Sequence, residues 1–451
     1  MSSILKKFPN DPPRPNVVKG DGIFIHLENG KKLLDTTAGW TSYAVLGYSH
    51  PEVLEAMKVQ MTKFCHMDYN IWNNPQIEEL ADLMLSRAPH GLDKVYFGGT
   101  SGSDAIEAAM KLSYHVHHDS GKPEKTGYIS RAQSFDGATL HAMSVSDLPI
   151  LDLYRPLLPT NFGKIPEHNP IRHKKPDESL DEYARRGAKD LEDKILEMGP
   201  DRVAAFVGET ILGSLVGDVP AAPNYWKYIR EVCDRYDVHI ILDEVYCGMG
   251  RSGRIYAYDW DDFRPDFVCI GKNFAAGYAP MSAVVTNGTV EDIIAKGSGR
   301  IQLGHTYQGF SLGVAAALAV QKIVHTDDML AQINKIGAFM RETLVSELGS
   351  HPFFREVRGR GLIFALEYDC PNVHPFSLEL QRVMEEEHDI LINSKWHRAS
   401  FVPAYIMDND QTELVLDRFI DTFRTVAARH DGADDDFADR PGAFGGVKAG
   451  S

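Results

Sequence analysis

Short apolar runs separated by helical patterns constrain the fold of this chain more than any other feature of its sequence. The clearest four runs are KVYF (94–97), RVAAFVG (202–208), VHIIL (238–242) and DFVCIG (266–271). Each is apolar on both faces, as strands covered by helices on both sides of a sheet must be. Residues 224–237, between two of these runs, carry one apolar helical stripe of Ile229, Val232, Cys233 and Tyr236. From about residue 51 to 320, this alternation predicts β/α units on a mostly parallel sheet.

The segments on either side of this region have a different pattern of apolar and polar residues. Residues 20–36 alternate apolar and polar positions around Asn29-Gly30, which predicts a hairpin. After about residue 325 the pattern is helix, strands, helix, strand and helix, which indicates a smaller α+β domain. The last twenty residues are rich in Asp and Gly, which is typical of a solvated tail, and an arm onto a partner subunit is the alternative.

The composition excludes several classes of protein. The 451 residues include 47 Lys and Arg against 63 Asp and Glu, so the formal net charge is −16. We expect no nucleic-acid partner, because surfaces that bind nucleic acid are basic. Most apolar runs are shorter than the roughly 20 residues that a membrane span requires, and the N-terminal residues lack the apolar core of a signal peptide. The sequence therefore predicts a cytoplasmic protein with no membrane partner.

Cysteine and histidine positions predict neither a disulfide framework nor a metal site. The five cysteines are scattered and none has C-x-x-C spacing, so we expect them to be buried thiols. His115, His117 and His118 lie close in sequence but do not line one helical face, so we expect them to be exposed at a helix end.

Two of the predicted strands end in residues that can carry chemistry. Asp243-Glu244 directly follows the strand 238–242, and Gly271-Lys272 follows the strand 266–271. The separation from Asp243 to Lys272 suits one step between neighbouring parallel strands, whose carboxyl ends open into the ligand crevice. A buried salt bridge without any catalytic role is the alternative for this pair alone.

A third element lies at residues 97–112, which read as a strand end, a small-residue turn and a helix start. Ser101 and Asp104 have the spacing of a capping box, and small residues at 101–103 allow a phosphate to approach the helix N-terminus. A capped helix without a ligand is the alternative. Together, a phosphate cradle, a strand-end aspartate and a strand-end lysine are what pyridoxal phosphate requires.

Six longer segments resemble those of one known family, in the same order. They are LGYSHPEV (46–53), TSGSDAIEAAMKL (100–112), ILDEVYCGMGRSG (241–253), GKNFAAGYAPMSAVV (271–285), GHTYQGFSLGVAAALA (304–319) and EVRGRGLIFALE (356–367). The third is close to the DEV-x-x-G-x-GR-x-G signature of the class III aminotransferases, which belong to the pyridoxal-phosphate enzymes of fold type I. The resemblance runs from about residue 20 to 427.

The resemblance implies an α/β fold of fold type I, with a large, mostly parallel sheet of the seven-stranded type and a smaller α+β domain. Residues 1–60 would be an N-terminal segment that joins the small domain, and 61–325 the large domain that binds pyridoxal phosphate. Residues 326–430 would form the small C-terminal domain, and 431–451 a flexible tail.

The resemblance also implies roles for individual residues. Lys272 would form the Schiff base and move the proton, and Asp243 would pair with the pyridine nitrogen. The other cofactor-binding residues would be Ser101, Gly102 and Ser103 for the phosphate, Phe135 and Val245 on the two ring faces, Gly137, Glu209, and Thr306 for the phosphate of a partner subunit.

Three departures from the family pattern concern the substrate pocket. Asp136 stands where the family usually has His, Thr210 where it has Pro, and Phe310-Ser311 where it has His-Pro or Asn-Pro. Substrate contacts are expected from Trp40 and Tyr43, for which core packing is an equally good account. Arg398 would bind a substrate carboxylate, although a surface arginine, or a register that puts Asn393 in its place, is an alternative.

The expected function is amino transfer from an amine or ω-amino acid to a 2-oxo acid such as pyruvate, by a ping-pong mechanism. Its small-molecule partners would be that amino donor and that acceptor, and the chain would form a homodimer with shared active sites, or a tetramer. An aminomutase or a decarboxylase with the same cofactor is the alternative, and a non-catalytic binding module is disfavoured because Lys272 and Asp243 are both present.

Overall fold

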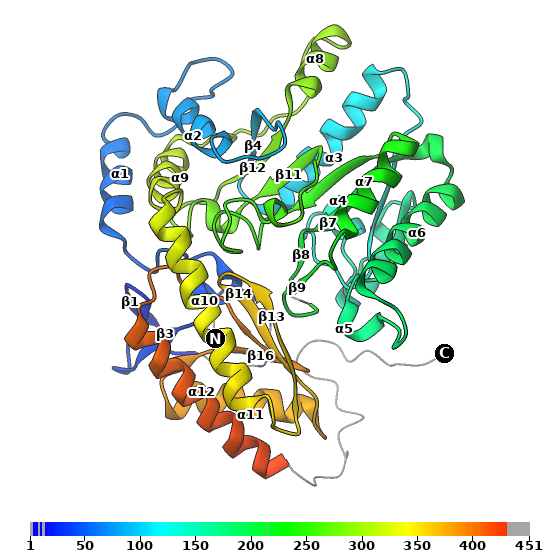
Figure 1. The fold of residues 1–451 in the computed structure, drawn as a ribbon. Coiled ribbons are helices and arrows are strands. Elements are labelled where there is room, and N and C mark those ends of the chain that lie inside the picture. Colours follow the sequence, from blue (N-terminus) through cyan, green and yellow to red (C-terminus); the bar gives the residue numbers. More distant parts are fainter. Residues whose placement is uncertain (1–2, 8–9, 11–13, 214, 431–451) are drawn as a thin grey trace.

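Seven strands form the central sheet, in the order β4, β12, β11, β10, β7, β5, β6 (Figure 1). Their bounds are Lys94–Gly99, Ser282–Thr286, Phe267–Ile270, His239–Asp243, Val203–Glu209, Gly127–Arg131 and Phe162–Ile165. All run parallel except β12, which is antiparallel to both of its neighbours. The computed structural model describes residues 3–7, 10, 14–213 and 215–430, so the tail expected at 431–451 lies outside the described residues.

The four apolar runs are confirmed as strands β4, β7, β10 and β11, and β7 is buried at every position. Helices cover both faces of the sheet. One face packs against α3 (Gly102–Asp119), and the other against α6 (Leu180–Met198) and α7 (Tyr225–Tyr236). The stripe predicted on residues 224–237 is confirmed in α7, where Ile229, Val232 and Cys233 are buried. Burial on both faces explains why the strand sequences do not alternate.

Further helices lie around the sheet. They are α1 (Pro51–Met61), α2 (Pro75–Leu85), α4 (Leu140–Val145), α5 (Pro170–His173), α8 (Gly288–Lys296) and α9 (Ser311–Val324). The pair α1 and α9 pack together, as do α2 and α9, at the β4 side of the sheet (Figure 1). A two-stranded hairpin of β8 (Ile211–Leu212) and β9 (Val219–Pro220) follows β7.

The smaller α+β part follows α9. Its sheet has the order β13 (Phe354–Arg360), β14 (Ile363–Tyr368), β17 (Arg398–Phe401), β16 (Asn393–Lys395), and its helices are α10 (Asp327–Leu348), α11 (Val373–Glu387) and α12 (Asn409–His430). These helices lie together at the end of the molecule opposite α8 (Figure 1). The predicted order of elements after residue 325, namely helix, strands, helix, strand and helix, is therefore confirmed in outline.

The N-terminal strands pair with a strand from this smaller part. β1 (Val17–Asp21), β2 (Phe24–Leu27) and β3 (Lys32–Asp35) form an antiparallel meander, and β15 (Ile390–Leu391) adds to β3 in parallel. The hairpin predicted around Asn29-Gly30 is confirmed, and Gly30 has the positive φ of 87° that such a turn favours.

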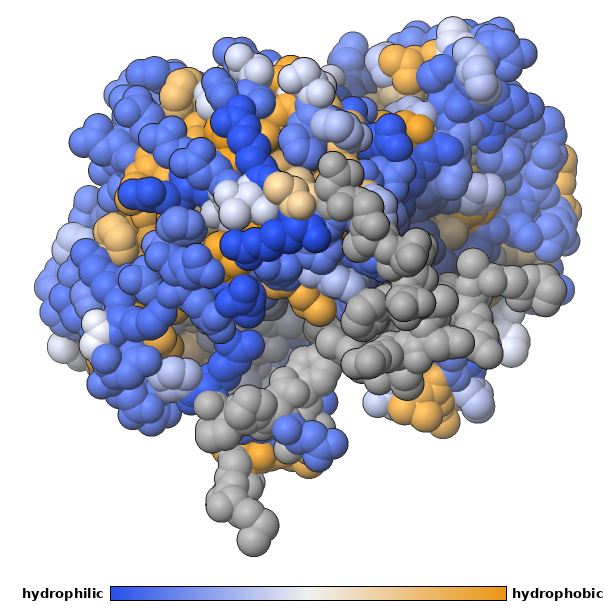
Figure 2. Space-filling model, turned by 90° about the horizontal axis from the view of Figure 1, so that it is seen from below, coloured by the Kyte–Doolittle hydropathy of each residue, from blue (hydrophilic) through white to orange (hydrophobic). Residues whose placement is uncertain are grey.

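Hydrophilic residues dominate the face that Figure 2 shows, and the hydrophobic residues lie among them in smaller groups. Within the described residues, no helix combines the length and the apolar character that crossing a membrane would require.

Candidate active site

The carboxyl ends of β7, β10 and β11 bring the predicted chemical groups together. Asp243, the last residue of β10, is paired in register with Glu209 on β7 and with Cys269 on β11. A cavity of about 530 Å³ opens at this edge. Ten of the predicted site residues line it: Tyr43, Ser101, Gly102, Ser103, Phe135, Gly137, Glu209, Asp243, Val245 and Lys272.

Lys272 lies three residues beyond Cys269 in a constrained conformation. Its φ of 38° is in the left-handed region, which L-residues avoid unless the surrounding structure imposes it. Its Nζ is 4.9 Å from the centre of the Tyr246 ring. Burial lowers the pKa of Lys272, because an ammonium ion loses hydration in the cavity. This favours the neutral amine, which is the nucleophilic form.

Asp243 and Glu209 both accept hydrogen bonds from the backbone. Asp243 Oδ1 accepts from the N–H of Val245 at 2.8 Å. Glu209 accepts at both oxygens, from the N–H of Phe135 at 3.2 Å and from the N–H of Gly213 at 3.0 Å. Backbone donors of this kind favour the ionised form of a carboxyl group.

The start of α3 forms the third side of the cavity. The predicted capping box is confirmed, because Ser101 Oγ accepts from the N–H of Asp104 while the Asp104 carboxylate accepts from the N–H of Ser101. Within the described residues, nothing accepts a hydrogen bond from the N–H of Gly102 or Ser103. These two donors and the positive end of the helix dipole make an anion site.

Glycine is required where the walls of this site approach each other. A Cβ at Gly102 would lie 2.6 Å from Val245 Cγ1, and a Cβ at Gly137 would lie 2.7 Å from Ser103 Oγ. Gly137 also has a positive φ of 138°, which disfavours other residues. Ser103 Oγ accepts from the N–H of Ala138 at 2.9 Å, which fixes the loop after Phe135 against the helix start.

Three predicted residues lie outside this cavity. Thr306 lines a separate cavity with Tyr96 and Gln308. Trp40 is 42% exposed, and the ammonium group of Lys395 lies 5.6 Å from the centre of its ring. Arg398 is buried, and its guanidinium group donates to the Leu215 carbonyl at 3.0 Å.

Seven lining residues were not predicted as site residues, and two of them, Tyr246 and Asp136, carry ionisable side chains. Tyr246 follows Val245 in the DEV segment and has a buried phenol whose pKa is raised by burial. Asp136 also lines the cavity and is 2% exposed. Its sequence signal was the departure from the family's His, which pointed to this position without showing that the carboxyl group is buried.

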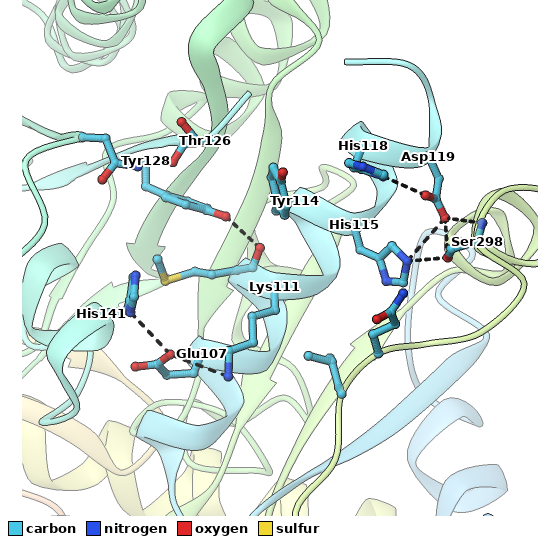
Figure 3. A pocket seen from close by; sticks show the side chains of 14 residues that line it. Glu107, Lys111, Tyr114, His115, His118, Asp119, Thr126, Tyr128, His141 and Ser298 are labelled. Carbon is cyan, nitrogen blue, oxygen red and sulfur yellow. Dashed lines mark hydrogen bonds and ion pairs between the residues drawn. The ribbon is translucent and has the colours of Figure 1, made fainter. Parts of the chain in front are cut away.

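A second cavity, of about 550 Å³, lies along α3 (Figure 3). His115 contacts Ser298 Oγ at 2.6 Å at one end, and His141 approaches Glu107 at the other. Lys272 and the strand-end carboxylates are not among the residues that line it, so we do not assign the chemistry to it. In the part of the chain that the structure describes, no three His, Cys, Asp or Glu side chains are grouped to hold a metal ion.

The expectation that His117 is exposed is wrong. It is 2% exposed, its ring centre lies 4.2 Å from that of His239, and its Nε2 is 3.0 Å from the Ala204 carbonyl. The reason is that this face of α3 packs against the sheet along its whole length. Burial lowers the pKa of His117 to about 4.

Comparison with known proteins agrees with this geometry. The model of the class III aminotransferase family matches residues 8–423. An aminotransferase from Gibberella zeae is 36% identical over 376 residues, which cover 82% of this chain and 73% of that protein. A diaminobutyrate–2-oxoglutarate transaminase from Halomonas elongata is 33% identical and covers 81% of this chain and 79% of its own length.

The structural comparison gives the same family. The omega transaminase from Pseudomonas jessenii, solved in complex with PMP, has a TM-score of 0.86 and 28% sequence identity to this chain. The alignment covers 93% of this chain and 94% of that one. The chain therefore belongs to the class III aminotransferases, the pyridoxal-phosphate-dependent amino-transferring enzymes of fold type I.

Proposed function

We propose that this aminotransferase takes an amino group from an amine or an ω-amino acid and passes it to a 2-oxo acid such as pyruvate, in two half-reactions at one site. The observation that carries the proposal is the cavity that combines a buried amine, a strand-end carboxylate and an anion site at a helix start. An ω-amino donor is further supported by relatives named as diaminobutyrate and gamma-aminobutyrate transaminases.

The residues of the cavity fit pyridoxal phosphate. The phosphate dianion would take the N–H groups of Gly102 and Ser103, which have no acceptor among the described residues. The Lys272 amine and the Asp243 carboxylate lie at the ends of neighbouring strands, and both line the cavity. When bound, the cofactor stores the amino group and withdraws electrons from the substrate Cα.

Lys272 would hold the cofactor through its Nζ and then act as the base that moves the substrate Cα proton. It can do so because burial favours the neutral amine. Asp243 would stay ionised and pair with the pyridine nitrogen, with Oδ1 held by the Val245 N–H. Phe135 and Val245 would cover the two faces of the ring, and Ser101, Gly137 and Glu209 would shape its surroundings.

The proposed substrate contacts are Tyr43, Trp40 and Arg398. Tyr43 lines the cavity and is placed there by two glycines, because a Cβ at Gly39 or Gly277 would meet its ring within 2.5 Å. Trp40 would border the entrance. Arg398 would reach a substrate carboxylate only after leaving the Leu215 carbonyl, so we propose it as a movable contact.

We also propose a homodimer in which Thr306 serves the partner's phosphate. Thr306 does not line the cavity of its own chain that holds Lys272. Its carbonyl accepts from His66 Nε2 at 2.8 Å, and nearby Tyr307 and Trp72 are 56% and 66% exposed. Exposed aromatic residues of this kind are typical of surfaces that another chain covers. A cytoplasmic location fits the five unpaired cysteines, since thiols persist in reducing compartments.

A donor–acceptor panel tests the proposed reaction. The purified protein, loaded with pyridoxal phosphate, is mixed with simple amines, 4-aminobutyrate or 2,4-diaminobutyrate, each with and without pyruvate or 2-oxoglutarate. Amino transfer requires both partners and yields the amino acid of the acceptor. An aminomutase would convert a donor alone, and a decarboxylase would release carbon dioxide. Either outcome, or no turnover with any pair, would contradict the proposal.

A further inference from the structure

Three carboxyl groups meet at the floor of the cavity, and one of them has no hydrogen-bond partner. Asp136, Glu209 and Asp243 all line the cavity, and their side chains are 2%, 5% and 6% exposed. Glu209 and Asp243 accept from backbone N–H groups, as described above. Neither carboxyl oxygen of Asp136 has a hydrogen-bond partner among the described residues. Burying an unpartnered carboxylate is costly, so this group is an exception that requires a cause.

The neighbouring hydroxyl groups donate to backbone carbonyls, although the Ser134 hydroxyl lies close enough to Asp136 to lower its pKa somewhat. Ser134 Oγ donates to the Arg131 carbonyl at 3.0 Å, and Ser146 Oγ accepts from the backbone N–H of Asp136 while donating to the Ala142 carbonyl. The loop therefore holds the backbone of Asp136 in place and leaves its carboxyl group facing the cavity.

The cations that face Asp136 also have other partners. Lys164 on β6 donates to Ser130 Oγ, to the Val145 carbonyl and to the Ser146 carbonyl, at 2.6, 2.7 and 2.9 Å. Arg131 on β5 donates to the Glu209 carbonyl and packs its guanidinium group 5.3 Å from the centre of the Trp226 ring. Lys272 faces Asp243 and Glu209. Of these cations, Lys164 and Arg131 lower the pKa of Asp136 from a distance, and none of the three forms an ion pair with it in the described part of the chain.

Three buried carboxyl groups at one floor cannot all stay ionised without a large cost, so the cluster retains a proton. On Glu209 the proton would give up a hydrogen bond from Phe135 or Gly213, and on Asp243 it would disfavour the bond from Val245. A proton on Asp136 would displace no hydrogen bond from a backbone N–H group. Burial raises the pKa of all three groups, to about 8 for Glu209 and Asp243, and for both of these a charge on Asp136 is the next largest cause. The hydrogen-bond geometry, rather than the pKa shift, distinguishes Asp136 from the other two.

We propose that Asp136 carries the proton of this cluster and is a positioning residue that keeps Asp243 ionised. A neutral Asp136 adds no negative charge beside Asp243 and Glu209, which would otherwise raise the proton affinity of both. The consequence for Asp243 rests on the role proposed above, in which its charge faces the pyridine nitrogen. The protonation of Asp136 does not depend on that role, because it concerns the protein without bound cofactor.

Infrared difference spectroscopy of the cofactor-free protein at neutral pH tests the inference. A protonated carboxyl group gives a carbonyl stretch that a carboxylate lacks. The wild-type spectrum minus the Asp136→Asn spectrum should show this band, whereas other buried acids with a raised pKa, such as Glu244 and Asp218, cancel in the subtraction. Glu209→Gln makes the same chemical change on β7 and removes one negative charge, so its band should persist but titrate at a lower pH than in the wild type. If Asp136→Asn does not fold, Asp136→Ala should lose the band in its place. A wild-type minus Asp136→Asn difference that lacks the band, or a band that is as completely lost in Glu209→Gln at pH 5 as at pH 7, would overturn the proposal.

Cofactor affinity gives a second readout. An amide mimics a neutral carboxyl group, so Asp136→Asn should bind pyridoxal phosphate within about threefold of the wild type, which is less than the tenfold that one pKa unit represents. Glu209→Gln should bind it at least about tenfold more weakly, because its amide cannot accept both N–H groups. A tenfold change in Asp136→Asn would show that the wild-type group is charged. The infrared band is measured without cofactor or substrate. A wild type that transfers no amino group would therefore refute the proposed function without affecting the test of Asp136.

Discussion

Replacing Gly102 with alanine tests the closest contact of the proposed phosphate site. An ideal Cβ at Gly102 would lie 2.6 Å and 2.7 Å from the two methyl carbons of Val245. Carbon atoms in contact are usually about 3.5–4.0 Å apart, so the helix start or Val245 must move by about 1 Å. Gly102 is the first residue of α3 and has no positive φ, so the backbone itself accepts alanine. The substitution therefore acts through packing alone.

The expected effect is large on cofactor affinity and small on stability. A shift of about 1 Å would move an N–H donor away from the phosphate, and a hydrogen bond to a charged group contributes about 1.5–3 kcal/mol. The dissociation constant of pyridoxal phosphate should rise about 10- to 150-fold. Overpacking costs about 1–3 kcal/mol, but the higher helix propensity of alanine offsets about 1 kcal/mol. The Tm of the cofactor-free protein should therefore fall by only a few degrees.

The assay is a titration of cofactor-free protein with pyridoxal phosphate, followed by fluorescence quenching. Gly98→Ala is the matched control, because the nearest atoms to its Cβ lie at an ordinary 3.6 Å, and its affinity should stay within about twofold. Adding Val245→Ala to Gly102→Ala should restore most of the affinity of Val245→Ala alone. Wild-type affinity in Gly102→Ala, or strictly additive effects of the two substitutions, would refute the packing argument.

Four further predictions follow from the same geometry. Lys272→Ala should abolish amino transfer and the absorption band of lysine-bound cofactor; full activity would contradict the assignment. Asp243→Asn should keep the fold, shown by circular dichroism, but lose about 100-fold or more in kcat, as removal of a group that stabilises transition-state charge does. Lys272→Ala and Thr306→Glu chains, each nearly inactive alone, should regain activity when they are refolded together. In a mixed dimer with shared sites, one site carries both substitutions and the other carries neither; no recovery would place Thr306 in its own subunit's site. Burial lowers the pKa of His117 to about 4, so the unfolded chain takes up its proton first, and His117 should contribute about 3 kcal/mol to the fall in the free energy of unfolding from pH 6.5 to 4. Denaturant titration should show a fall smaller by that amount in His117→Gln, since His325 and other buried histidines contribute to both proteins.

The strands could be predicted because their burial is recorded directly in the sequence. Strands β7, β10 and β11 are covered on both faces, so their sequences are continuous apolar runs bounded by polar residues. The carboxyl ends of parallel strands meet at one edge, so the pairing of Asp243 with Cys269, and the nearness of Lys272, followed from order along the chain. The capping box was predictable because it depends on residues only three positions apart.

Side chains on loops and on two-sided helices were less predictable. Arg398 is the first residue of β17, but its side chain turns to the Leu215 carbonyl, a contact between positions 183 residues apart. His117 is buried because α3 packs against the sheet, whereas the nearby His115 and His118 contact Ser298 and Asp119. Neither orientation leaves a local pattern, because each depends on which element lies opposite in the folded chain.

The electrostatics of the cavity depend on more than its depth. Burial acts in opposite senses on acids and bases, so the environment that keeps the Lys272 amine neutral would also neutralise every carboxyl group beside it. The roles proposed above require the first effect at Lys272 and, at Asp243, not the second. The Val245 N–H favours the charge on Asp243, and two further N–H groups favour it on Glu209, whereas Asp136 has no such donor among the described residues. Burial is the largest cause of the raised pKa at all three carboxyl groups, and the backbone donors offset part of it at Asp243 and Glu209. A proton on Asp136 would remove the next largest cause at the other two, so the backbone donors and a neutral Asp136 would together favour a charged Asp243.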